Sequence, residues 1–220
     1  HYDGVRLQEG ALPIIENWKK QGDIVHLEIA STQDIAVRKS IIKSIAPIVD
    51  SIGINEREAI DILEVSGCEK QAEACNVRTN SVNMFEALML IKKIIKAPRI
   101  QLHMFGLYMT LQDKGFKITP EANLRGMMLA ATVAASKAGT GNINKKENLL
   151  WAHGEQVSDV GLKELSDLAN HLHKPELTET GITEVDGFDL IALPTILVEK
   201  PLTLAGMGDT ISSLSLIGSR

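Results

Sequence analysis

Residues 201–213 of the sequence, PLTLAGMGDTISS, hold two glycines, one carboxylate and several hydroxyl side chains just ahead of an apolar-periodic segment. This composition predicts a tight turn that leads directly into a helix. Glycine in such a turn keeps side chains away from the backbone N–H groups, and a helix N-terminus carries partial positive charge. The amides of residues 205–208 could therefore bind an anion, such as a phosphoryl group during transfer.

Asp209 follows the second glycine of this turn and allows two interpretations. Its carboxylate could cap its own helix, a common role for aspartate at a helix start. It could instead accept the proton of an attacking hydroxyl group in a phosphoryl transfer. The Gly-x-Gly-Asp pattern alone favours the cap, because two glycines are a weak signal. The catalytic interpretation needs support from elsewhere in the chain.

His26 and Glu28 form a polar pair inside the apolar segment HLEIA. On a strand, residues i and i+2 share a face, so the two side chains would project together. Burying such a pair without partners is costly. A polar pair in an otherwise apolar strand therefore indicates a functional site more often than a core position. An exposed strand end explains the pair equally well.

Asn55 and Glu58 stand where a short apolar run gives way to a helical pattern. Asn55 can be the N-cap, and a glutamate three residues later completes a capping-box pattern. The same spacing puts both side chains on one face of the helix, where they could hold a hydrated Mg²⁺. Capping is sufficient to explain both residues, and the pattern alone favours it.

The elements that must position these residues follow from the alternation of apolar runs and amphipathic segments. Helices are predicted for residues 5–20, 32–48, 56–65, 82–96, 119–137, 162–173 and 206–216. Strands are predicted for residues 23–30, 99–108, 187–193 and 195–199, with a further short apolar run at 49–54. Residues 66–80, 140–157 and 176–186 are predicted to be loops. Strands separated by helical crossovers predict an α/β fold with a largely parallel sheet covered on both faces.

Composition excludes several classes of function. The chain has 220 residues, 44% of them hydrophobic, a formal net charge of −5 and scattered basic residues. It is therefore predicted to have no nucleic-acid partner, because a phosphate-backbone footprint needs clustered positive charge. No apolar run reaches the roughly 18 residues of a membrane span, so no membrane partner is expected either.

The two cysteines, Cys68 and Cys75, are too few for a disulfide framework and have no further ligands at zinc spacing. They are interpreted as reduced thiols of a cytoplasmic protein. No signal peptide opens the chain, and the first residues, His1 to Gly4, are typical of the interior of a longer protein. The sequence is therefore expected to be a fragment or a processed form.

Three of these clusters occur in the order HLEIAS (26–31), SIGINEREA (51–59) and PLTLAGMGDTIS (201–212). This order resembles the ADP-dependent glucokinase and phosphofructokinase family, whose hallmarks are H-x-E, N-x-x-E and G-x-G-D motifs. RIQLHMFGLYMTL (99–111) is similar to the family's R-x-x-x-H strand, and GMMLAATVAASKAGTG (126–141) to its Ala-rich helix. Five segments in order make the resemblance much more specific than any single motif, and it covers most of residues 23–213.

The resemblance assigns roles to the glycine-rich turn. Asp209 would be the catalytic base that takes the proton from the acceptor hydroxyl. Gly206, Met207 and Gly208 would supply the backbone anion hole.

The resemblance also assigns roles to the two polar pairs. Glu58 would organise Mg²⁺ through water, with Asn55 near the phosphates. Glu28 would tune the same metal site, and His26 would orient it.

His103 and Val198 would be neighbours of the nucleotide by the same resemblance. One departure concerns the residues before the first motif glycine, where the family usually has Thr-Val. Here Leu204 and Ala205 stand at those positions, with Thr203 one step earlier, which puts a phosphate-binding role of that threonine in doubt.

The resemblance implies a three-layer α/β/α ribokinase-like domain over residues 1–220. Family members are roughly twice this length, so the N-terminal part and lid domain are expected to be absent. The implied reaction transfers the β-phosphoryl of ADP to a hydroxyl of fructose 6-phosphate or glucose in glycolysis, giving AMP. The alternatives are an ATP-dependent ribokinase-like kinase for another small molecule, or a catalytically silent nucleotide-binding fragment. Oligomeric state is not predicted.

Overall fold

The computed structural model describes the backbone of residues 4–220 and the side chains of residues 10–220. His1 to Asp3, which suggested the interior of a longer protein, lie outside this range. Residue contacts divide the chain into two compact units, residues 1–102 and 103–220. The strands within residues 4–220 belong to one six-stranded sheet with the order β1-β2-β3-β4-β6-β5. The interpretation of residues 1–220 as a single domain remains a prediction.

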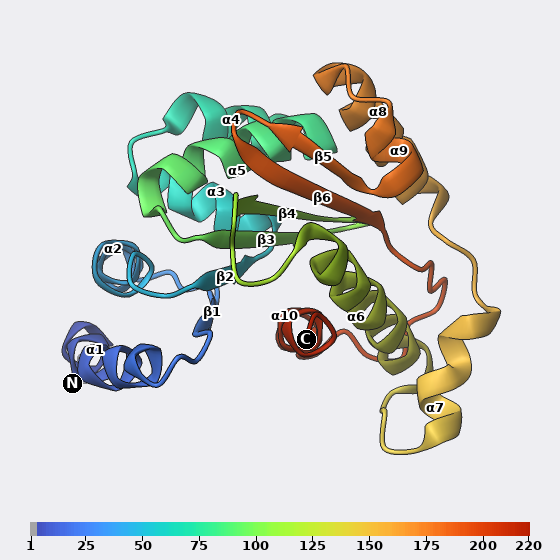
Figure 1. The fold of residues 1–220 in the computed structure, drawn as a ribbon, viewed down its shortest axis with the longest axis horizontal. Coiled ribbons are helices and arrows are strands. Elements are labelled where there is room, and N and C mark those ends of the chain that lie inside the picture. The colour runs from blue at the N-terminus through green and yellow to red at the C-terminus, as the bar shows by residue number, and fades with distance from the viewer. Residues whose placement is uncertain (1–3) are drawn as a thin grey trace. The chain divides into compact units, whose positions relative to one another are not determined.

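The strands of the first unit are parallel, as the crossover pattern predicts (Figure 1). They are β1 (His26–Glu28), β2 (Ser51–Ile54) and β3 (Arg99–Met104). β2 and β3 are buried along their whole length, as expected for parallel strands with both faces covered. β1 has only three residues, so the longer strand predicted at 23–30 is wrong in extent.

Helices precede and separate these strands along the chain. They are α1 (Gly4–Lys20), α2 (Ile35–Ser40), the π-helical turn η1 (Ile41–Ile45), α3 (Glu56–Val65), α4 (Glu69–Val77) and α5 (Ser81–Ile95). α2 begins later than predicted, because the side chain of Asp34 accepts from the amides of Ala36 and Val37 and is the true cap. α4 lies inside a predicted loop. Turn residues near Gly67 end α3, but a new helix starts at once and buries Ala72 and Cys75.

The strands of the second unit are antiparallel. They are β4 (Leu107–Asp113), β5 (Ile182–Val185) and β6 (Phe188–Pro194). The strand predicted for 99–108 ends early because Gly106, with φ +84°, turns the chain before β4 begins. The predicted loop at 176–186 is wrong, since it contains β5. The predicted strand at 195–199 is also wrong, since it holds a single bridge from Val157 to Ile196.

Helices of the second unit lie against both faces of these antiparallel strands (Figure 1). They are α6 (Pro120–Thr140), α7 (Lys146–Leu150), the 3₁₀ turn η2 (Trp151–Gly154), α8 (Asp159–Leu172), α9 (Glu176–Thr180) and α10 (Met207–Ile217). α6 packs against one face, where Met127 and Ala130 join Tyr108 and Ile191 in a buried cluster. α8 packs against the other face. α7 and η2 occupy part of the predicted loop at 140–157, so that prediction is wrong there.

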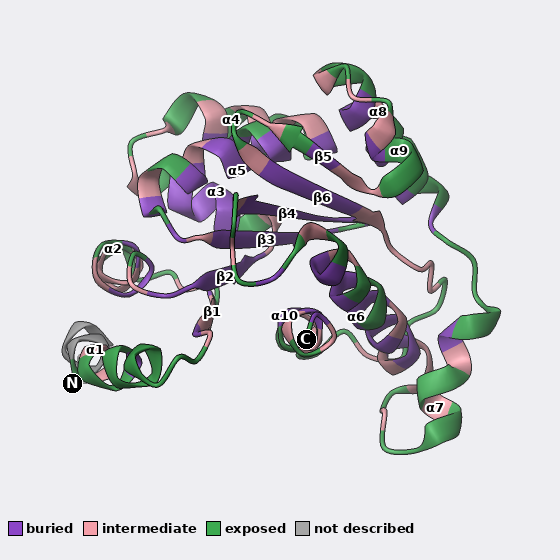
Figure 2. Cartoon of the chain, in the orientation of Figure 1, coloured by how far each residue is buried: buried purple, intermediate pink, exposed green. Residues whose placement is uncertain are grey.

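α6 and α10 pack at van der Waals contact along a glycine-lined crossing. A Cβ atom added at Gly126 would lie 2.0 Å from the carbonyl oxygen of Ser215, and one at Gly218 would lie 3.1 Å from Gly126 Cα. Only glycine therefore fits at Gly126 without moving the backbone of α10. Buried residues line one side of α6 and exposed residues the other, as Figure 2 shows. Within residues 4–220, no helix combines the length and apolar character needed to cross a membrane.

Candidate functional site

The glycine-rich turn of the second unit begins α10. Gly206 is the N-cap, in the left-handed conformation at φ 62° and ψ 30°, and no side chain caps the helix. The amides of Gly206, Met207 and Gly208 make no hydrogen bond within the part of the chain that the structure describes. The amide of Ala205 does not join them, because it donates to Thr203 Oγ1 at 3.2 Å. Three amides at a helix N-terminus remain free to bind an anion.

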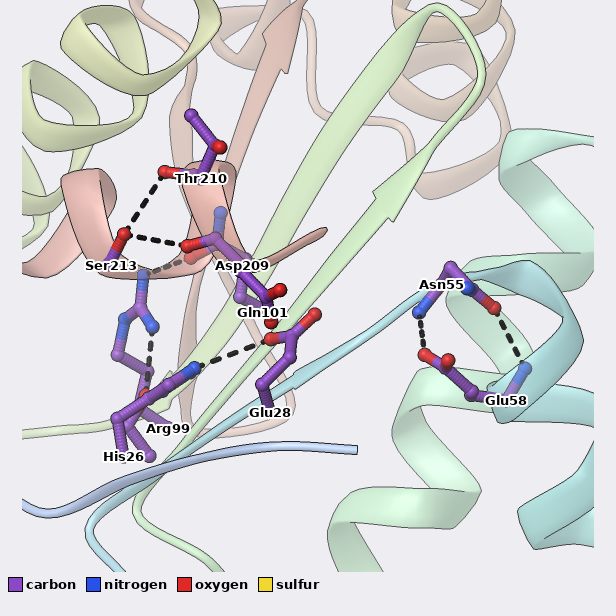
Figure 3. Close-up of polar contacts among 10 residues, drawn as sticks. His26, Glu28, Asn55, Glu58, Arg99, Gln101, Asp209, Thr210 and Ser213 are labelled. Atoms are coloured by element: carbon purple, nitrogen blue, oxygen red, sulfur yellow. Dashed lines mark hydrogen bonds and ion pairs between the residues drawn. The ribbon is translucent and has the colours of Figure 1, made fainter. Parts of the chain in front are cut away.

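Asp209 is the third residue of α10 and is exposed. It is not the N-cap, and its carboxylate makes no hydrogen bond to any residue between 4 and 220. Only its carbonyl is used, accepting from Ser213 Oγ at 2.6 Å (Figure 3). The capping interpretation of this carboxylate is therefore wrong, although a negative charge in the first turn still complements the helix dipole.

Sheet register in the first unit brings polar side chains from three strands into one row. His26 lies beside Ser51, and Ser51 lies beside Arg99. Glu28 and Gln101 stand two residues further along their strands, on the same face. The sequence predicts the His26–Glu28 pair but not the residues beside it, because the pairing register between neighbouring strands cannot be read from a single sequence.

Hydrogen bonds connect this row into a chain that ends at Glu28 (Figure 3). Arg99 Nη1 donates to Ser51 Oγ at 2.8 Å, and Arg99 Nη2 donates to Gln101 Oε1 at 2.6 Å. His26 Nδ1 lies 2.9 Å from Ser51 Oγ, and His26 Nε2 lies 3.4 Å from Glu28 Oε2. Arg99 is fully buried, and burial lowers its pKa to about 9, so the guanidinium keeps its charge at neutral pH. A buried cation therefore supports the side chain that orients Glu28.

Replacing Ser51 by alanine is expected to destabilise the protein by about 1–3 kcal/mol, because it leaves a buried charged donor of Arg99 without that acceptor. Urea denaturation would measure the loss. In the Arg99→Met background the charged donor is already gone, so the further change Ser51→Ala should cost less than it does in the unmodified protein. An unchanged midpoint in the Ser51→Ala variant would show that the contact carries no stability.

Asn55 and Glu58 form the capping box at the start of α3. Asn55 Oδ1 accepts from the Glu58 amide at 2.9 Å, and Glu58 Oε2 accepts from the Asn55 amide at 2.8 Å. Ser31 Oγ donates to the other oxygen, Oε1, at 3.2 Å. The capping interpretation is therefore confirmed.

Glu58 also forms part of the wall of a small, partly open pocket in the first unit. The wall is largely isoleucine, and its other charged side chains, Arg38 and Asp61, are paired with each other at 2.9 Å. In Figure 3 the Asn55–Glu58 pair lies apart from the His26–Glu28 pair.

The remaining predicted residues lie on less defined structure. His103 is buried near the end of β3. Val198 is half-buried in the irregular segment between β6 and α10. The location of His103 and Val198 in the fold does not test whether either residue contacts a nucleotide, so both assignments stay predictions.

Lys137, on the last turn of α6, is a residue that the sequence gives no reason to select. Its Nζ donates to the carbonyl oxygen of Gly206 at 3.1 Å and to Thr210 Oγ1 at 3.0 Å. Basic residues are ordinary in the last turn of a helix because they complement the dipole, so its type and position carried no signal. The structure makes it the side chain that contacts the glycine-rich turn from another helix.

An exposed carboxylate beside unsatisfied helix-start amides, on a mixed α/β fold, is an arrangement that suits phosphoryl transfer. The family model described as "ADP-specific Phosphofructokinase/Glucokinase conserved region" matches residues 6–218. The chain therefore belongs to the ADP-specific phosphofructokinase/glucokinase family, as its motifs suggest.

Similar proteins carry names consistent with this family. The chain is 32% identical over 196 residues to an ADP-dependent glucose/glucosamine kinase of Pyrococcus furiosus, covering 88% of this chain and 41% of that protein. It is 28% identical to an ADP-specific phosphofructokinase of Methanosarcina acetivorans, covering 93% and 44%. The chain thus spans less than half the length of these relatives.

Solved structures agree with the fold. The last common ancestor of ADP-dependent phosphofructokinases from Methanosarcinales superposes with a TM-score of 0.90 at 29% identity, over 96% of this chain and 46% of that one. An ADP-dependent kinase in complex with fructose-6-phosphate and ADPβS gives a TM-score of 0.89 at 29% identity, over 96% and 48%. The fold is therefore the ribokinase-like α/β fold of these kinases.

Proposed function

We propose that this protein is, or is part of, an ADP-dependent sugar kinase that transfers the β-phosphoryl group of ADP to a sugar hydroxyl, giving AMP. The observation that carries the proposal is Asp209, whose exposed carboxylate is free of hydrogen bonds to the described residues beside the unsatisfied amides of α10. The acceptor is fructose 6-phosphate or glucose, with fructose 6-phosphate favoured. The similar kinase structure with fructose-6-phosphate and ADPβS supports both ligand classes.

The carboxylate and the backbone amides of the turn have different roles in the proposed reaction. Asp209 accepts the proton of the sugar hydroxyl as that oxygen attacks phosphorus, which leaves the carboxyl group protonated after the step. The amides of Gly206, Met207 and Gly208 donate to the oxygens of the phosphoryl group, where negative charge is spread during transfer. The bond to the AMP oxygen breaks, and AMP leaves with the electron pair.

Mg²⁺ is the proposed cofactor, and when bound it would neutralise the diphosphate charge. Within residues 4–220 no three His, Cys, Asp or Glu side chains gather to form a metal cage. The donors do fit a cation that arrives with the diphosphate and keeps its waters, as Mg²⁺ usually does. Glu58 would organise such a cation through its waters, and Glu28, supported by His26, would tune the same site.

Further predictions on the site belong to the same proposal. Asn55 would lie near the phosphates, and His103 and Val198 would neighbour the nucleotide. The reaction would serve sugar breakdown by glycolysis in the cytoplasm. A catalytically silent nucleotide-binding domain is the second candidate, because the chain spans less than half the length of its relatives.

The test measures nucleotide choice in two assays. Calorimetry on the 220-residue chain with MgCl₂ should show binding of ADP and weaker binding of ATP. An AMP-release assay should show turnover with ADP and fructose 6-phosphate or glucose, weak or undetectable in the chain by itself and robust in a longer form. Binding of ADP with no turnover in a longer form would favour the silent domain. Turnover with ATP but not ADP would favour an ATP-dependent kinase and refute the proposal.

A further inference from the structure

The carbonyl group of Gly206 is held from outside its own helix. Its oxygen accepts the Thr210 amide at 3.1 Å and Thr210 Oγ1 at 2.8 Å, as an ordinary helix start allows. It also accepts Lys137 Nζ from α6 at 3.1 Å, and the same ammonium donates to Thr210 Oγ1 at 3.0 Å. Charge-assisted hydrogen bonds of this kind are stronger than neutral ones.

Orientation of this carbonyl fixes the direction of an amide proposed to bind phosphate. The peptide bond between Gly206 and Met207 is trans, because the described chain contains no cis peptide. In a planar trans peptide, the C=O and the N–H point in opposite directions. Lys137 therefore acts on the Met207 N–H, because holding the Gly206 oxygen on one side aims this donor to the other side.

The segment ahead of the turn gives little other support. Leu202 and Leu204 are 71% and 68% exposed, and Gly206 has no side chain to restrict its backbone. The amide of Leu202 does donate to the carbonyl of Ala138 at 2.7 Å, next to Lys137 at the end of α6. The end of α6 is therefore the local anchor for the turn.

α6 is rigid enough to serve as that anchor. Its buried face packs on the sheet through Met127 and Ala130. Near its start it meets the last turn of α10 at Gly126 and Gly218, at a distance that admits no side chain. Near its end it meets the first turn of α10 through Lys137. The two helices are thus fixed to each other at both ends.

We propose that Lys137 is a positioning residue that holds the Gly206–Met207 peptide and the first turn of α10 in the orientation used for phosphoryl transfer. The consequence for catalysis rests on the function proposed above, whereas the orienting role is a property of the fold. The ammonium has three donors and uses two of them on Gly206 and Thr210.

Hydrogen exchange tests the orienting role without any substrate. In the 220-residue chain, Lys137→Met should raise the exchange rate of the Thr210 amide by about tenfold, as local opening of the first turn becomes easier. Thr210→Val removes the other end of the contact and should act in the same direction. Lys137→Arg keeps both the charge and the donors, so it should restore most of the protection. Lys146→Met, at an exposed lysine of α7, is the matched control and should change nothing.

Kinetics test the catalytic consequence in a form that turns over. Lys137→Met should lower kcat by about tenfold with little change in KM for ADP, and Lys137→Arg should recover most of the loss. Unchanged exchange at the amide of residue 210 in the folded Lys137→Met and Thr210→Val variants would overturn the proposal. Failure of ADP-dependent turnover in the unmodified protein would instead sink the proposed function, and the exchange result would still decide the role of Lys137.

Discussion

Replacing Asp209 by asparagine is expected to lower turnover by a factor on the order of 10² to 10⁴, the usual contribution of a general base. Asparagine has nearly the same shape but cannot accept the proton of the sugar hydroxyl. Affinity for ADP should change by less than about threefold, because the amides of Gly206, Met207 and Gly208 remain in place. Steady-state kinetics in a form that turns over, together with calorimetry, would measure both quantities.

A second aspartate provides the matched control. Asp159 also lies in the first turn of a helix, α8, and is exposed. Asp159→Asn removes the same favourable charge from a helix N-terminus without touching the glycine-rich turn. It should leave turnover unchanged. If Asp209→Asn were equally silent, the carboxylate would only complement the dipole of α10, and the proposed mechanism would lose its base.

Gly126→Ala is expected to destabilise the protein by about 2–3 kcal/mol, at the upper end for overpacked sites. The added methyl group would lie 2.0 Å from the carbonyl oxygen of Ser215. That atom belongs to the backbone, so relief requires movement of α10 as a whole. Urea denaturation would measure the loss, and exchange at Thr210 should rise as the turn shifts with its helix.

Gly10→Ala is the matched control for this effect. Gly10 is also inside a helix, α1, and an added Cβ would meet none of the described atoms within 4 Å. Alanine is the better helix former, so this change should stabilise the helix by roughly 0.5–1 kcal/mol. Equal stability of the two variants would show that the α6–α10 crossing tolerates a side chain.

Much of the fold could be predicted from local pattern. The amphipathic helices α5 and α6 lie within one to three residues of their predicted bounds. The predictions were wrong where polar or turn-forming residues made a strand or a helix resemble a loop. β5 was missed because only Thr183 of its four residues is buried, so its sequence resembles a loop. α4 was missed because turn residues around Gly67 separate two helices and do not open a loop.

The candidate site was predictable to the extent that its chemistry is local in sequence. The Asn55–Glu58 cap and the turn at Gly206 are formed by neighbours, and both appear where expected. The partners that support them are distant in sequence. Arg99 reaches Ser51 only through the register of β2 and β3, and Lys137 reaches Gly206 across 69 positions.

The reciprocal hydrogen bonds between Asn55 and Glu58 show which property of the side chain at position 58 the helix cap needs. Glutamine could make the same cap, since its amide offers one oxygen to the Asn55 amide and its NH₂ group could pair with Ser31. Folding at this helix start therefore requires a hydrogen-bonding group of the right length and does not require an anion. The negative charge of Glu58 is a separate property of this position, and it also interacts favourably with the N-terminal end of the dipole of α3.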